Sequence, residues 1–285
     1  GSTLGVVSPP SVVLIIIGLS TEQSIARLFY GGIGAGIILA ILLILTVYVV
    51  CRIYPEWGPV GPKTGFIEKI IAVSGALEMI ILFSLVMLGL YFGFFTPAEA
   101  GAAGSFFAVV ISTIQGRLSW KGFIASIADT LRISCMVIMI VAGAMLFGRF
   151  LAVTRIPFDI AAWVVGLPVS GTVIMMIIFA IYIIGGAVMD ALALLLITIP
   201  IFFPVARQLG YDPLWFGVTI TVVTTLGAVT PPVGATTYVV GGMAKGIPLE
   251  EVFKGVAYFL PAYIICVVVL MLFPWLVTFL PGLLH

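Results

Sequence analysis

The sequence has little charge for its length. Of 285 residues, 8% are charged and 62% are hydrophobic, and the mean hydropathy is +1.35. Soluble domains carry roughly 25% charged residues, so a water-soluble domain is excluded and an all-α polytopic membrane protein is expected. At ~20 apolar residues per spanning helix, seven or eight spans and some re-entrant pieces fit the chain. The net charge of +1 gives no basis for binding nucleic acid.

Cysteine and histidine are too scarce for metal or acid–base chemistry. Cys51, Cys135 and Cys266 are far apart, and the single histidine, His285, is the last residue. No disulfide or transition-metal site is therefore expected. An intramembrane enzyme is disfavoured because no Ser–Lys dyad or acidic constellation shares one membrane face. A channel is disfavoured because the sequence lacks rings of charge and a filter-like motif.

Hydropathy and helix breakers divide the chain into expected segments. Thr96 is an expected helix cap, with Pro97 in the first helical position and Glu99 in the first turn. Amphipathic connectors are expected at 64–74 and 119–132. The apolar segments are a short arm over 9–18, spans over 28–51, 70–92, 97–112 and 133–153, a short helix over 157–167, half-helices over 214–224 and 234–242, and a last span over 255–280.

Two apolar runs, 173–184 and 187–203, flank the pair Gly185 and Gly186. They form either one long kinked helix or a hairpin that enters the membrane and returns, with the glycines at its tip. Asp190 lies within the second run. An ionisable residue inside a membrane segment is a functional candidate by default, and the alternative is a helix cap or an interhelical hydrogen bond.

An internal repeat is the most specific feature of the sequence. TLGVVSPP at 3–10 matches TLGAVTPP at 225–232 in six of eight positions, with Ser8 standing for Thr230. In both copies a short apolar arm, a charged link and a longer apolar run follow. A single copy could be an ordinary proline kink. Interrupted segments at corresponding places in two halves are typical of secondary transporters and point to their binding site.

The paired prolines free oxygen atoms. Pro231 and Pro232 supply no N–H, so carbonyls of the preceding turn, including those of Gly227 and Ala228, lose their helical donors. In lipid such carbonyls must be buried in protein or line a cavity. A sodium ion is an expected partner, because hard cations prefer oxygen ligands, and the hydroxyl of Ser8 or Thr230 would complete the site. The following half-helix points its positive end at the same space, where a substrate carboxylate is expected.

These motifs resemble those of one transporter family. LGAVTPPVG, preceded by GYDPLWFGV and GGAVMDALALLLITIPIFFP, looks like the large membrane subunit of tripartite ATP-independent periplasmic (TRAP) transporters, as do FTPAEAGA and TLGVVSPPS. The resemblance covers nearly the whole chain. It implies an inverted-repeat elevator fold, similar to the ion transporter superfamily, with a re-entrant hairpin and discontinuous helices. It also implies that an N-terminal portion with a first hairpin is missing from this chain.

The resemblance further implies a function and its partners. The function is sodium-coupled import of a small organic acid across the bacterial inner membrane, and C4-dicarboxylates and sialic acids are both compatible substrates. A periplasmic substrate-binding protein would deliver the substrate, and a small membrane subunit would brace the large one. Two sodium ions are the implied cofactors. The alternative is a stand-alone sodium- or proton-coupled carboxylate carrier that needs no binding protein.

Carried over onto this sequence, the family motifs imply two sodium sites. One consists of Gly186, Gly227, Thr230 and Val233, and the other of Gly5, Ser8 and Pro10. The substrate-binding candidates are Asp190, Thr225 and Thr236. Thr236 stands where the family often has Asn, and Ser8 where an apolar residue is commoner.

The expected domains follow from this placement. Residues 1–27 and 169–254 are assigned to a transport domain, as the second half of the first broken helix and as the hairpin with the second broken helix. Residues 28–168 are assigned to scaffold and connecting spans, and 255–285 to a C-terminal span.

Overall fold

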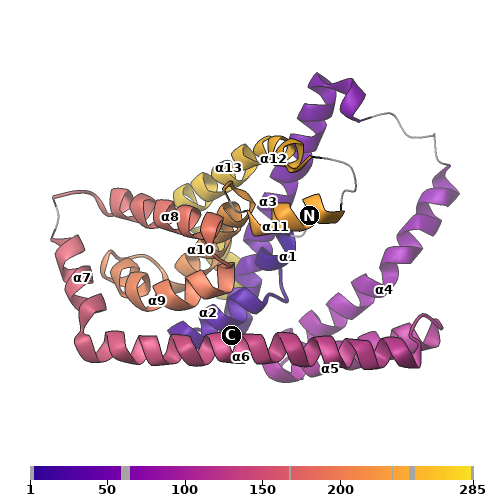
Figure 1. Cartoon of the computed structure of the whole chain (residues 1–285), viewed down its shortest axis with the longest axis horizontal. Coiled ribbons are helices and arrows are strands. Elements are labelled where there is room, and N and C mark those ends of the chain that lie inside the picture. Colours follow the sequence, from indigo (N-terminus) through magenta and orange to yellow (C-terminus); the bar gives the residue numbers. More distant parts are fainter. Residues whose placement is uncertain (1–2, 59–64, 167, 233, 244–247, 284–285) are drawn as a thin grey trace. The chain divides into compact units, whose positions relative to one another are not determined.

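The chain is helical wherever its structure is described. The computed structural model describes residues 3–58, 65–166, 168–232, 234–243 and 248–283, and no strand occurs among them (Figure 1). This confirms the all-α prediction. In this part of the chain six helices are long and apolar enough to cross a membrane, fewer than the seven or eight expected: Leu4–Thr21, which contains the first break, Ile25–Ile53, Trp120–Thr154, Gly171–Val188, Ala191–Gln208 and Leu249–Leu272.

The helices are numbered in chain order. They are α1 (Leu4–Val7), α2 (Val12–Thr21), α3 (Ile25–Ile53), the 3-10 turn η1 (Pro55–Trp57), α4 (Phe66–Tyr91), α5 (Pro97–Ile114), α6 (Trp120–Thr154), α7 (Ile156–Val165), α8 (Gly171–Val188), α9 (Ala191–Gln208), α10 (Pro213–Val229), α11 (Ala235–Met243), α12 (Leu249–Ala257), α13 (Leu260–Leu272) and α14 (Trp275–Gly282).

The chain forms two compact units, one of residues 1–57 and 140–285 and one of residues 58–139. In the smaller unit α4 packs on α5, and Glu78 forms an ion pair with Arg117 at 3.5 Å. Helix α5 begins as predicted. The Thr96 hydroxyl accepts from the Glu99 N–H at 3.3 Å, and the Glu99 carboxylate accepts from the Thr96 N–H at 2.8 Å, which is a complete capping box.

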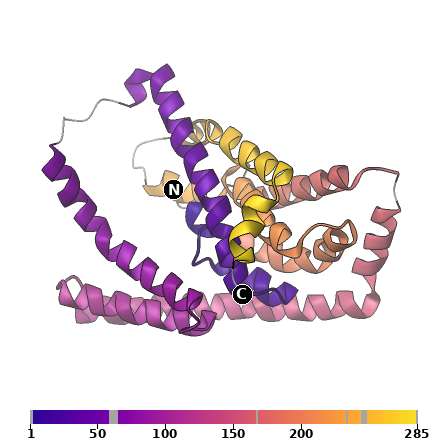
Figure 2. The same cartoon turned by 180° about the vertical axis from the view of Figure 1, so that it is seen from behind.

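Helix α10 is the centre of the larger unit. Almost every one of its residues is buried, as expected of a helix that is apolar on all sides. It contacts α8, α9, α2, α3 and α13. The C-terminal helices α13 and α14 lie beside α3 (Figure 2). Helix α3 therefore packs on α10 and belongs to the same unit as α8 and α9, while the predicted functional domains remain predictions.

The connector at 119–132 and the span at 133–153 are not separate elements. They form the single helix α6 of 35 residues. At about 1.5 Å per residue it is roughly 52 Å long, against a hydrocarbon core of ~30 Å. No proline or glycine pair interrupts residues 120–154, so the change in polarity near Arg132 does not end the helix. The expectation of a separate connector was wrong.

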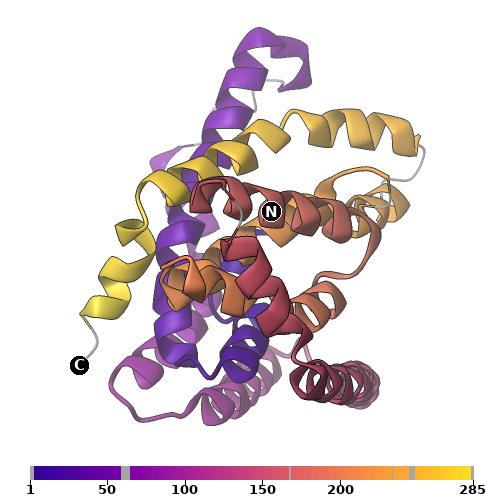
Figure 3. The same cartoon turned by 90° about the vertical axis from the view of Figure 1, so that its left-hand side faces the viewer.

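The last span, predicted over 255–280, is not one unbroken helix. The apolar stretch Leu249–Leu272 is long enough to cross a membrane, but it is divided into α12 and α13, and α14 follows after another bend (Figure 3). Pro261 lies in the first turn of α13, and Pro274 precedes α14. Each proline removes a helical donor. The carbonyl of Leu270, which loses its donor to Pro274, accepts from the buried Trp215 indole N–H at 2.7 Å.

Helices α8 and α9 form a hairpin and not one long kinked helix; since each is long and apolar enough to cross a membrane, the re-entrant path stays a prediction. The Tyr182 and Thr198 hydroxyls are hydrogen-bonded across it at 2.7 Å, and a Cβ built on Gly185 would lie 2.7 Å from the Leu194 side chain. The turn consists of Met189 and Asp190, which are extended. The tip is thus a few residues beyond Gly185 and Gly186, which lie in the last turn of α8. Placing the tip at the glycines was wrong, because both fit within the helix.

Candidate functional site: two broken helices and a hairpin

The two Pro-Pro breaks have nearly the same backbone. Ser8 ends α1 with φ −80° and ψ 136°, and Thr230 ends α10 with φ −84° and ψ 139°. The Pro9–Pro10 and Pro231–Pro232 peptide bonds are both cis. A second helix follows each break, α2 in the first case and α11 in the second. The sequence repeat is therefore also a repeat of conformation.

At the second break the hairpin touches the broken helix backbone to backbone. A Cβ built on Gly186 would lie 2.9 Å from the Thr224 carbonyl oxygen and 3.2 Å from the Gly227 Cα, and one built on Gly227 would lie 2.6 Å from the Ile183 carbonyl oxygen. Only glycine at both positions permits this approach. Gly186 and Gly227 were predicted to share one site, and the structure brings them together.

The hairpin also contacts the chain after the break. The Gly234 N–H donates to the Ala187 carbonyl at 3.3 Å. Gly234 has a φ of +52°, which favours glycine, and a Cβ there would lie 2.9 Å from the Phe253 ring of α12. The Phe253 and Tyr238 rings pack edge to face with centroids 5.9 Å apart. Val233, a predicted ligand, lies outside the described residues.

Thr230 lies at the end of α10, half-buried, with its hydroxyl turned back onto the helix. The hydroxyl donates to the Leu226 carbonyl at 2.7 Å, and the Thr230 N–H donates to the Gly227 carbonyl at 2.9 Å. A hydroxyl that donates its hydrogen keeps lone pairs as acceptors. Thr230 can therefore offer oxygen to a cation in the place where the sequence predicted it.

The other carbonyls at this break have hydroxyl partners. The Thr236 hydroxyl donates to the Ala228 carbonyl at 2.8 Å, and the Thr237 hydroxyl donates to the Val229 carbonyl at 3.2 Å. The prolines remove the helical donors of the Gly227 and Ala228 carbonyls, as predicted; the Thr230 N–H replaces the first and the Thr236 hydroxyl of α11 replaces the second. Sequence reasoning missed Thr237. The signal available was a hydroxyl pair in the first turn after a double proline.

The first break packs against a different partner. A Cβ built on Gly36 of α3 would lie 2.5 Å from the Ser8 Oγ, and one built on Gly32 would lie 2.7 Å from the Val7 carbonyl oxygen. Gly5 is exposed, and no described atom beyond its own turn lies within 4 Å of a Cβ built there. Pro10 is also exposed. Of the three predicted residues, only Ser8 is in close contact with a glycine of α3.

The three substrate-binding candidates are all bonded to backbone groups. The Asp190 carboxylate accepts from the N–H groups of Leu192 at 2.9 Å and Ala193 at 3.4 Å and so caps α9. The Thr225 hydroxyl is 1% exposed and bonds to carbonyls of its own helix. Thr236 bonds to Ala228 as described. For Asp190 the structure has the helix cap that was the alternative to a functional role.

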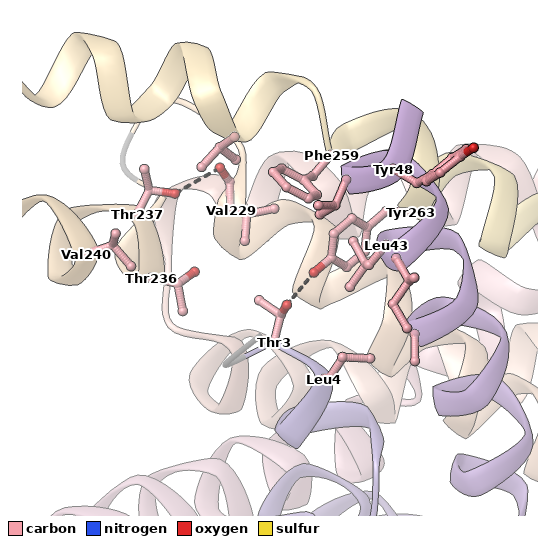
Figure 4. A pocket seen from close by; sticks show the side chains of 14 residues that line it. Thr3, Leu4, Leu43, Tyr48, Val229, Thr236, Thr237, Val240, Phe259 and Tyr263 are labelled. Carbon is pink, nitrogen blue, oxygen red and sulfur yellow. Dashed lines mark hydrogen bonds between the residues drawn. The ribbon is translucent and has the colours of Figure 1, made fainter. Parts of the chain in front are cut away.

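A cavity of about 710 Å³ lies between α1, α3, α11 and the α12–α13 elbow (Figure 4). Its wall is mostly apolar, with Leu43 and Phe259 among the lining residues. The Thr3 hydroxyl in this wall is hydrogen-bonded to the Tyr263 hydroxyl. No lysine or arginine of the described chain lines the cavity.

Fold and site together define a polytopic all-α membrane protein in which a helical hairpin packs against a discontinuous helix. The family model of the tripartite ATP-independent periplasmic transporter, DctM component, matches residues 1–276. The chain belongs to this family. This confirms the resemblance found in the sequence.

Similar proteins include three large permease proteins that are named for different substrates. The C4-dicarboxylate TRAP transporter large permease protein of Pseudomonas aeruginosa is 30% identical over 98% of this chain and 64% of its own length. The sialic acid protein of Vibrio cholerae and the ectoine protein of Halomonas elongata are each 30% identical over 98% of this chain and 65% of their own lengths.

The chain thus spans about two thirds of the length of these curated relatives. The family consists of transporter components and not of enzymes. With six helices able to cross a membrane in the described part, the chain is a multi-pass protein of the inner membrane.

Proposed function

We propose that this chain is part of a sodium-coupled importer of a small organic acid that works by an elevator movement. In this proposal a periplasmic binding protein delivers the substrate and a small membrane subunit braces the large one. Family membership supports the general class. The three relatives are named for three different substrates, and each is 30% identical to this chain. Sequence identity therefore supports an organic solute as the substrate but does not favour one of these compounds over the others.

The contact between Gly186 and Gly227 is the observation that carries the proposal. It brings the carbonyl oxygens of Ile183 and Thr224 to the seam between hairpin and broken helix, and Thr230 ends the same helix. Oxygen atoms from two elements at one place suit a hard cation. A cation there would link the hairpin to α10, because it would bind both at once.

The second sodium site is proposed at the first break, around Gly5, Ser8 and Pro10. The support is the equivalence of the two breaks: the residues that end α1 and α10 have matching dihedral angles. Gly5 corresponds to Gly227, and Ser8 to Thr230. The site at the first break is thus proposed because its backbone matches that of the second break, whereas the site at the second break is supported in addition by the hairpin contact.

Transport by the intact complex in proteoliposomes tests this function. The full subunit that contains this chain, its small subunit and its binding protein should take up substrate only with an inward sodium gradient and with the binding protein present. A potassium gradient of equal size is the control. Uptake that persists in potassium would contradict sodium coupling. Sodium-driven uptake without the binding protein would instead favour a stand-alone carrier.

A further inference from the structure

The second proline of each break orphans one particular carbonyl. In an α-helix the carbonyl of residue i accepts from the N–H of residue i+4. Pro10 and Pro232 have no N–H, so the carbonyls of Val6 and Ala228 lose their donors. These two carbonyls occupy equivalent positions in the repeat. An unpaired carbonyl in a membrane segment costs free energy, so each needs another donor.

In both breaks a hydroxyl from the downstream side replaces the lost donor. The Ser11 hydroxyl donates to the Val6 carbonyl, and Ser11 also caps α2 by accepting from the Leu14 N–H at 3.3 Å. The Thr236 hydroxyl donates to the Ala228 carbonyl at 2.8 Å. Ser11 corresponds in the repeat to Val233 and not to Thr236. Different positions therefore supply the same bond to the same carbonyl.

Each bond joins the two halves of a broken helix. Ser11 is 1% exposed, and Thr236 is half-buried in the first turn of α11. At the second break the Thr237 hydroxyl adds a parallel bond to the Val229 carbonyl at 3.2 Å. Ala228 lies directly between Gly227 and Val229. The Ala228 carbonyl belongs to the Ala228–Val229 peptide plane, so the Thr236 bond holds the peptide plane that directly follows Ala228, whose backbone N lies 3.4 Å from a Cβ built on Gly186.

We propose that Ser11 and Thr236 are positioning residues that set the geometry of the two breaks and through it the affinity for sodium. The proposal rests on the sodium coupling proposed above. Thr236 then acts through the backbone and contacts neither ion nor substrate, in contrast to its prediction as a substrate-binding residue. A preorganised site binds its ion more tightly because less conformational entropy is lost when the ion binds.

Three substitutions in the intact transporter complex test this role. Thr236→Val keeps the shape and removes the hydroxyl, Thr236→Ser restores the hydroxyl, and Thr219→Val is the matched control. The Thr219 hydroxyl is buried in α10 and has no hydrogen-bond partner in the described structure. The measured quantities are the sodium concentration for half-maximal uptake and the substrate KM at saturating sodium.

Thr236→Val should raise the half-maximal sodium concentration roughly two- to tenfold, the range of one hydrogen bond. The substrate KM at saturating sodium should stay unchanged, and Thr236→Ser and Thr219→Val should behave as the parent. Ser11→Ala should also raise the sodium requirement. A valine variant that raises the substrate KM and leaves the sodium requirement unchanged would overturn the proposal in favour of a substrate contact. A serine variant as impaired as the valine would also overturn it.

Backbone hydrogen exchange tests this proposal independently of the proposed function. It can also be measured on a variant that transports poorly. The Gly234 N–H, which donates to Ala187 across the seam, should exchange faster in Thr236→Val than in Thr236→Ser. If the parent transports without sodium, the proposed function fails, and this exchange difference still decides whether Thr236 positions the break. Equal exchange in the two variants would contradict the positioning role.

Discussion

The two breaks of this chain have the same internal geometry and different surroundings. Ser8 and Thr230 have matching dihedral angles, and a downstream hydroxyl caps the equivalent carbonyl in each. Yet the first break packs on α3, whereas the second packs on the hairpin through Gly186. The shape of a break is thus set locally, by two prolines and a hydroxyl. The partner that covers it is set by the rest of the fold.

Substitution of the packed glycines should give the largest difference in stability between variants of the two breaks. At the second break, Gly227→Ala places a methyl group 2.6 Å from the Ile183 carbonyl oxygen and 2.9 Å from the Gly186 Cα. Backbone cannot move aside easily, so we expect a loss of stability of about 1–3 kcal/mol or more and loss of transport.

At the first break, Gly36→Ala meets the Ser8 hydroxyl, a small side chain that can rotate. We expect it to cost about 1 kcal/mol or less. Thermal unfolding of the purified transporter measures both variants. Equal losses would contradict the contrast between backbone and side-chain contacts.

The long apolar segments that follow the two breaks also differ from each other. Helix α3 is continuous, whereas Pro274 bends the run after the second break, and Trp215 donates to the orphaned Leu270 carbonyl. Trp215→Phe keeps an aromatic ring and removes this donor. We expect a loss of about 1–3 kcal/mol, since a buried carbonyl is left unpaired.

Tyr263→Phe is a control for the Trp215 variant, because it removes a bond between two hydroxyls and leaves no backbone carbonyl unpaired. It should cost about 1 kcal/mol. If Trp215→Phe unfolded at the parent temperature, the indole N–H would have no part in the bend.

The hydroxyls that end α1 and α10 test whether both breaks bind sodium. Thr230→Val removes a proposed ligand oxygen and should raise the half-maximal sodium concentration for uptake while leaving folding nearly intact. Ser8→Ala should act in the same direction. Sodium titrations of uptake measure both. An unchanged sodium requirement in Thr230→Val would remove Thr230 from the ligand set.

Thr219→Val should have the smallest effect. The Thr219 hydroxyl is buried without a hydrogen-bond partner in the described structure, so replacing it with a methyl group removes an unpaired polar atom. We expect unchanged or slightly raised stability, by about 0.5 kcal/mol, and unchanged sodium dependence. A marked loss of stability would mean that the hydroxyl does have a partner, and Thr219→Ser would then restore it.

Features encoded over a few residues could be predicted from the sequence. Thr96 and Glu99 form the capping box that their spacing indicates, and the double prolines follow the ends of α1 and α10, although α10 continues to Val229, past its predicted end at Thr224. The contact of Gly186 with Gly227 was also anticipated, from the family motifs. The two sodium sites and the domain assignment stay predictions.

Features that depend on neighbours could not be predicted. The hairpin turn lies at Met189 and Asp190 because the glycines fit within α8, where Gly227 faces Gly186. The last span divides into three helices, and the bend at Pro274 is stabilised by Trp215, which bonds to the carbonyl of Leu270, 55 residues away in the sequence. A hydropathy value is an average over neighbouring residues in the sequence. It therefore does not show which carbonyl accepts a hydrogen bond from a residue far away in the sequence.

Sodium-dependent stabilisation of the purified transporter tests the central claim most directly. Thermal unfolding should be measured in sodium and in potassium at equal ionic strength, for the parent and for Gly227→Ala. Sodium should raise the unfolding temperature of the parent above its value in potassium, and Gly227→Ala should lose this difference. Equal unfolding temperatures of the parent in the two salts would contradict a sodium site between the hairpin and the second break.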